Sequence, residues 1–141
     1  MADFTWSYSA LKQYENCPRQ YNEIRVLKNY VVKENEAMRY GTEVHKALED
    51  YVAEGKPLAK NYQRFKSMVD PLVDIPGIKY PEHEMALTYD KLPCDFGSEH
   101  RWVRGIADLL IVDGDYAFIV DYKTGSNKYP DPKQLRLMAL M

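Results

Sequence analysis

The feature that most constrains the fold is a pair of apolar runs joined by a tight turn signal. Residues 105–112 and 115–123 each have the composition of a β-strand. Gly125, two positions after the second run, marks the turn that ends it. Between them stands Asp113-Gly114, a strong signal for a two-residue hairpin loop. The chain is therefore predicted to build its sheet around this β-hairpin.

Three charged residues interrupt the apolar hairpin. Asp121 and Lys123 are two positions apart, so in a strand both side chains leave on the same face. With Asp113-Gly114 as the loop, Asp108 is the diagonal neighbour of Asp121, roughly 7–8 Å away on that face. A four-residue loop over 113–116 would instead place the two aspartates directly opposite each other. A three-residue loop would place them on opposite faces.

The preferred loop thus brings two carboxylates and an ammonium group together. Two carboxylates at this distance repel each other unless a positive charge lies between them. A divalent cation with oxygen ligands meets that requirement. A lone Asp-x-Lys is more simply explained as a salt bridge at a strand end. The hairpin favours a metal site because it adds the second carboxylate, Asp108.

Five short motifs follow one another along the chain. They are Cys17-Pro18, Gly41-Thr42-x-x-His45, Gly105-x-x-Asp108, Asp121-Tyr122-Lys123 and Gln134. In this order they resemble the RecB-like branch of the PD-(D/E)xK nucleases, which includes AddB-type and CRISPR-associated exonucleases. The resemblance implies an α/β fold with a restriction-endonuclease-like core, a mixed central β-sheet flanked by α-helices. It also implies one nuclease domain over residues 1–141, although family members normally continue beyond the point where this chain stops.

The same resemblance implies a role for each residue of the motifs. The implied metal ligands are His45, Asp108, Asp121 and the backbone carbonyl of Tyr122. Lys123 would orient or help deprotonate the attacking water, and Gln134 would lie near the scissile phosphate. The implied catalytic group is therefore Asp108, Asp121, Lys123 and Gln134.

His45 falls in a helix predicted over residues 36–54 and ended by Gly55. A lone histidine beside an apolar stripe is usually a hydrogen-bonded residue of the core boundary. The motif around it favours a ligand or active-site group instead, with Gly41 allowing a close backbone approach.

Two further positions have competing explanations. Glu84, which opens a predicted strand over residues 84–89, loosely matches a family glutamate near the metal. Glu82 competes for that place, and a solvent-facing glutamate is the alternative. Gln134 also completes a good capping box that begins at Asp131, and Met138 stands where the family has a tyrosine.

The cysteine content bears on cofactors and compartment. Cys17 and Cys94 are too few for a disulfide scaffold and suggest a reducing compartment. Some RecB-like proteins bind an iron–sulfur cluster through four cysteines. Three of these are missing here, so no cluster is expected and Cys17 is predicted to be free and buried. The chain has no apolar run of about 18 residues and no signal-peptide pattern, so a cytoplasmic protein without a membrane partner is expected.

A net charge of −2 excludes the global basic surface of a passive nucleic-acid binder. A metal nuclease does not need one. The expected function is a deoxyribonuclease using Mg²⁺ or Mn²⁺, with exonuclease action favoured over endonuclease action. It would act on single- or double-stranded DNA ends in recombination, repair, or phage or CRISPR DNA processing, as a homo-oligomer or in a larger complex. The alternative is a non-catalytic nuclease-like module that binds DNA or a partner.

Overall fold

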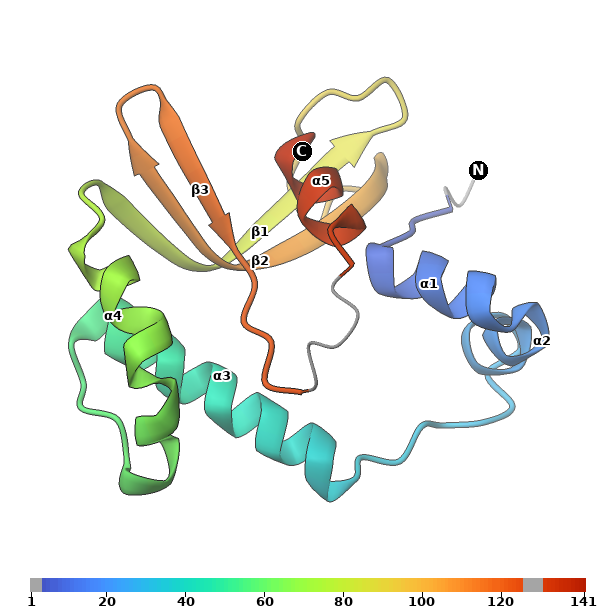
Figure 1. Ribbon diagram of the computed structural model, residues 1–141. Helices are drawn as coiled ribbons and strands as arrows, with labels where there is room; N and C mark the ends of the chain where they lie inside the picture. Colours follow the sequence, from blue (N-terminus) through green and yellow to red (C-terminus); the bar gives the residue numbers. More distant parts are fainter. Residues whose placement is uncertain (1–3, 126–130) are drawn as a thin grey trace. The chain divides into compact units, whose positions relative to one another are not determined.

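The computed structural model describes residues 4–125 and 131–141, and Figure 1 shows its helices and strands. The chain divides into two compact units. Unit 1 contains the described residues of 4–34, 84–105 and 136–141, and unit 2 contains those of 35–83 and 106–135. Each unit is described by itself below.

The element order confirms the predicted α/β class. The helices are α1 (Tyr8–Asn16), α2 (Pro18–Tyr21), α3 (Glu36–Glu54), α4 (Lys66–Asp74) and α5 (Lys133–Ala139), with a π-turn at Asn22–Val26 and a 3₁₀ helix at Lys60–Phe65. The strands are β1 (Ile78–Thr88), β2 (Arg101–Asp113) and β3 (Tyr116–Val120). They form one sheet in the order β1-β2-β3, with the long strand β2 in the middle (Figure 1). A parallel bridge joins Trp6 to Val103 in unit 1.

The predicted hairpin forms, but its loop is shifted by one residue. β2 and β3 are antiparallel, and their pairing extends to Asp113 opposite Tyr116, so the loop is Gly114-Asp115. Gly114 has a φ of +57°, as the first position of a type II′ turn requires. Continued by one step, the pairing of Leu109 with Val120 places Asp108 opposite Asp121. The preferred register was therefore wrong, and the register of the four-residue alternative is the one observed.

Helix α3 is the longest element and matches the predicted range. The side chain of Asn35 caps it by accepting a hydrogen bond from the Met38 N–H at 2.9 Å. Gly55, with a φ of +70°, ends it in the left-handed conformation. Val44 and Leu48 are fully buried and hold one stripe of the helix in the core of unit 2.

The core of unit 2 joins α3, α4 and the hairpin. Its buried members are Val44, Leu48, Val52, Leu58, Val69, Leu109, Ile111 and Tyr122. Leu109 and Ile111 are alternate residues of β2, so the strand presents one row of side chains to the core. Asp108 stands next to Leu109, and this places a carboxylate at the margin of the core.

Helix α4 continues past a proline. Pro71 lies inside α4, and the helix ends at Asp74. Val69 is fully buried and Leu72 packs against the same core, so tertiary contacts outweigh the hydrogen bond that the proline removes.

Two smaller expectations concern Cys17 and the membrane. Cys17 is free but exposed, not buried as predicted. Its sulfur caps α2 by accepting a hydrogen bond from the Gln20 N–H at 3.4 Å. In the described part of the chain, no helix has the length and apolar character needed to cross a membrane.

Candidate functional site

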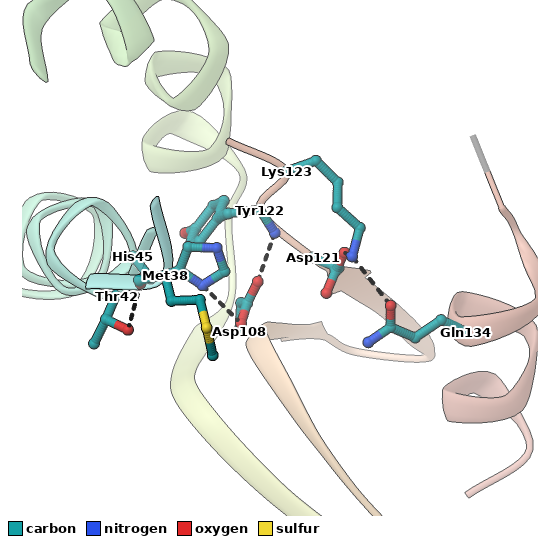
Figure 2. Close-up of polar contacts among 8 residues, drawn as sticks. All are labelled: Met38, Thr42, His45, Asp108, Asp121, Tyr122, Lys123 and Gln134. Atoms are coloured by element: carbon teal, nitrogen blue, oxygen red, sulfur yellow. Dashed lines mark hydrogen bonds and ion pairs between the residues drawn. The ribbon is translucent and has the colours of Figure 1, made fainter. Parts of the chain in front are cut away.

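The centre of the candidate site is the contact between α3 and β2. The His45 Nδ1 lies 3.3 Å from the Asp108 Oδ1, and Figure 2 shows the two side chains pointing toward each other. The other carboxylate oxygen of Asp108 accepts a 2.6 Å hydrogen bond from the Tyr122 backbone N–H. The side chain of Asp108 is 14% exposed and that of His45 is 31% exposed, so the pair is partly accessible to solvent.

The environment of Asp108 opposes its ionisation. Burial raises the pKa of its carboxyl, and the negative charge of Asp121 acts in the same direction. The Tyr122 N–H, His45 and Lys123 oppose this rise. A positive charge beside Asp108 would therefore be stabilising.

Tyr122 supports both members of the central pair. Its ring meets the His45 imidazole edge to face, with centroids 5.9 Å apart and planes at 89°. Only 4% of Tyr122 is exposed, and burial raises the pKa of its hydroxyl to about 12. That hydroxyl has no hydrogen-bond partner in the described part of the chain.

A second polar group forms at the end of the hairpin. The Lys123 ammonium is ion-paired with Asp121 and also donates a 3.1 Å hydrogen bond to the Gln134 Oε1 (Figure 2). The side chain of Gln134 therefore contacts Lys123. Asp131 caps the helix that contains Gln134, and its carboxylate accepts a hydrogen bond from the Lys133 N–H at 3.0 Å.

A cleft of about 520 Å³ opens beside the His45–Asp108 pair. It is lined by Met38, Gly41, Thr42, His45, Lys46, Glu49, Glu82 and Asp108. The cleft does not require a glycine at position 41. An added Cβ would lie 3.7 Å from the Thr124 Oγ1, which is an ordinary van der Waals contact.

Glu82 is the glutamate of β1 that lines this cleft. Its φ of +47° is rare for a residue with a side chain, and such backbone strain is concentrated at functional sites. Desolvation raises the pKa of its carboxyl, with further contributions from Asp108 and Glu49. Glu84, the position preferred from the sequence, belongs to unit 1, and its predicted role stays a prediction.

The sequence interpretation did not include Glu49. This residue follows His45 by four positions on α3, so the two share one face of the helix, and Glu49 lines the same cleft. That spacing was the available signal. Glu49 also lies 3.2 Å from the Lys46 ammonium through its Oε1.

The central pair offers one nitrogen and one oxygen donor, atom types that bind divalent cations. His45 Nδ1 and Asp108 Oδ1 lie 3.3 Å apart, in direct contact with each other. Asp121 is the third expected side-chain ligand, and here it is paired with Lys123. Across residues 4–125 and 131–141, no three His, Cys, Asp or Glu side chains are grouped closely enough to hold a metal. The Tyr122 backbone joins the site through its N–H.

The unpartnered hydroxyl of Tyr122 predicts an unusual response to mutation. Tyr122→Phe should leave the protein as stable as the wild type or stabilise it by about 1 kcal/mol, because it removes a desolvated polar group and keeps the ring. Tyr51→Phe is the matched control, since its hydroxyl donates a 2.5 Å hydrogen bond to Asp70 and its removal should destabilise by about 1 kcal/mol. Urea unfolding of both variants measures the difference. A clear destabilisation by Tyr122→Phe would show that its hydroxyl has a partner.

Comparison with known families supports a nuclease. A sequence model of the PD-(D/E)XK nuclease superfamily matches residues 5–75, just over half of the chain, and this segment includes Gly41 and His45. No curated protein and no solved structure matched the chain. The chain therefore belongs to the PD-(D/E)XK nuclease superfamily, whose members are divalent-metal-dependent nucleases.

Proposed function

We propose that this protein is a DNA exonuclease of the RecB-like branch that hydrolyses phosphodiester bonds with Mg²⁺ or Mn²⁺. The observation that carries the proposal is the pairing of His45 with Asp108 beside the Lys123–Asp121 ion pair, all within unit 2. Membership of the nuclease superfamily supports DNA as the substrate. The order of the five motifs supports the RecB-like branch, and with it a task in recombination, repair, or phage or CRISPR DNA processing.

The chain's own groups divide into metal binding and water positioning. Asp108 and His45 would hold the cation, with Asp121 and the Tyr122 carbonyl completing the set. The bound metal supplies a Lewis acid that activates water and stabilises charge on the phosphate oxygens. A nitrogen ligand such as His45 favours Mn²⁺ over Mg²⁺ relative to a site made only of oxygens.

Lys123 and Gln134 would act on the attacking water and the phosphate. The Lys123 ammonium is fixed by two acceptors, so its remaining N–H is directed rather than free to rotate. It would orient the water and stabilise the negative charge that develops on the phosphate. The water oxygen would form a bond to phosphorus while the bond from phosphorus to the 3′ oxygen breaks. The products would be a 5′-phosphate end and a 3′-hydroxyl end.

The decisive experiment is the degradation of end-labelled linear DNA, single- and double-stranded, in Mg²⁺, Mn²⁺ or EDTA. We expect metal-dependent degradation that is lost in Lys123→Ala and Asp121→Ala and retained in Asp115→Ala, which changes an exposed loop carboxylate. Release of label as mononucleotides or short fragments from one end would indicate an exonuclease and its polarity. Folded wild-type protein that degrades no DNA with either metal would contradict the proposal.

A further inference from the structure

A chain with a net charge of −2 has to hold a polyanion through a few well-placed cations. Four of the lysines that the structure describes in unit 2 are already paired with carboxylates. Lys46, Lys56, Lys66 and Lys123 are each ion-paired with a carboxylate. Arg39 and Arg64, by contrast, have no carboxylate partner among the described residues, and both are exposed.

Arg64 is held in place although it is exposed. Its guanidinium carbon lies 4.7 Å from the centre of the Phe65 ring and 5.7 Å from the centre of the Tyr40 ring. Its Nη2 donates a 2.8 Å hydrogen bond to the Tyr40 hydroxyl. Within the described ranges of the chain, the contact with the Phe65 ring leaves the N–H donors of the guanidinium unused apart from the one given to Tyr40, and such a planar set of donors suits a phosphate.

A continuous surface leads from the cleft toward Arg64. A second hollow, of about 480 Å³, lies on α3 and shares Thr42 and Lys46 with the cleft. Arg39 and Glu43 also line it. The Glu43 carboxylate accepts a 3.3 Å hydrogen bond from the Tyr62 hydroxyl.

From Tyr62 the surface continues to Arg64. The centre of the Tyr62 ring lies 6.1 Å from that of the Tyr40 ring, and the Tyr40 hydroxyl accepts the hydrogen bond from Arg64. Tyr40 precedes His45 by five residues, about 7.5 Å along the helix axis and about 140° around it. The cleft and the arginine-bearing surface therefore lie on different faces of the same helix.

This surface carries charges of both signs. Asp50, which also lines the second hollow, is paired with Lys46 at 3.0 Å and with Lys56 at 3.6 Å. The Glu43 carboxylate accepts a hydrogen bond from the uncharged Tyr62 hydroxyl. Arg39 and Arg64 add positive charges that are paired with no carboxylate in the described part of the chain.

We propose that Arg39 and Arg64 contact backbone phosphates of the DNA strand as it leaves the cleft across the exposed face of α3. This inference rests on the proposed DNA-cleaving function and adds a path for the substrate. Contacts to phosphate carry no sequence information, so this surface binds DNA of any sequence.

The test is the salt dependence of DNA binding, measured by fluorescence anisotropy in the Lys123→Ala background so that no DNA is degraded. Arg64→Gln should weaken binding about threefold to tenfold and reduce the slope of log K against log salt by about 0.7 to 0.9. Arg39→Gln should reduce it similarly, and the double variant by about twice as much. Arg64→Lys should keep the slope and weaken binding, because it keeps the charge and loses the fork and the stack.

The control is Arg19→Gln, the same charge change at an exposed position of α2, which should leave the slope unchanged. In the cleavage assay, with Lys123 intact, Arg64→Gln should raise KM and leave kcat unchanged. The Arg39 side chain makes no hydrogen bond or ion pair with the residues that the structure describes, so Arg39→Gln tests the surface even if Arg64→Gln perturbs folding. An unchanged slope in a folded double variant would overturn this inference and leave the nuclease function standing. A wild type that binds DNA without cleaving it would contradict the function and not the surface.

Discussion

Asp108→Asn is expected to reduce the rate of DNA cleavage by about 10³-fold with little change in stability. The substitution keeps the size of the side chain, and the amide oxygen can still accept the Tyr122 N–H. It removes the negative charge beside His45, which is the charge that a divalent cation would need. Losing one group that stabilises transition-state charge typically lowers kcat by 10²- to 10³-fold, and the loss of a metal ligand lies at the upper end.

The assay is initial-rate cleavage of labelled DNA over a range of Mn²⁺ concentrations, with thermal unfolding to verify the fold. Asp115→Asn, which makes the same chemical change in the hairpin loop, is the control and should retain wild-type rates. A folded Asp108→Asn variant with more than a tenth of wild-type activity at every Mn²⁺ concentration would exclude Asp108 as a metal ligand.

Gly77→Ala should have the largest effect on stability, a loss of more than about 3 kcal/mol. Gly77 has a φ of +115°, where a side chain is strained. An added Cβ would also lie 2.3 Å from the Val112 backbone oxygen and 2.8 Å from its carbonyl carbon. Backbone atoms of a paired strand cannot move aside as a flexible side chain would, so β2 would have to shift.

Gly114→Ala separates the cost of the positive φ from the cost of the contact with Val112. It has a positive φ of +57° and nothing within 4 Å of the added Cβ, so only the conformational penalty of about 1–2 kcal/mol should remain. Urea unfolding of both variants gives the comparison. Equal losses in the two variants would show that the contact with Val112 relaxes and contributes nothing.

Elements with strong local signals in the sequence, such as helix α3 and the hairpin, were predicted at their observed places in the chain. Helix α3 was predicted over its full range because an apolar stripe and a terminal glycine agree. The hairpin was predicted, but Asp113-Gly114 permits glycine either as the second or as the first loop residue. Only cross-strand pairing selects between these registers, and that selection is not local.

The site shows the same division between local and distant information. His45 and Asp108 were predicted as metal ligands, and their side chains do lie together. Glu82 was named only as a competitor of Glu84; it lines the cleft, and its positive φ cannot be inferred from residue type. The role of Glu84 stays a prediction. Pro71 inside α4 and the exposure of Cys17 likewise could not be inferred from residue type.

The distance along the chain between His45 and Asp108 has a consequence for the protein during its synthesis. The two residues are 63 positions apart, and Asp108 reaches its place only after β2 has paired and packed on α3. Contacts that close so long a loop form late in folding, since the entropy of closure is spent before the contact stabilises the chain. A nascent or partly folded chain therefore lacks the paired donors. Any chemistry that needs both donors becomes available only after the hairpin and α3 of unit 2 have packed together.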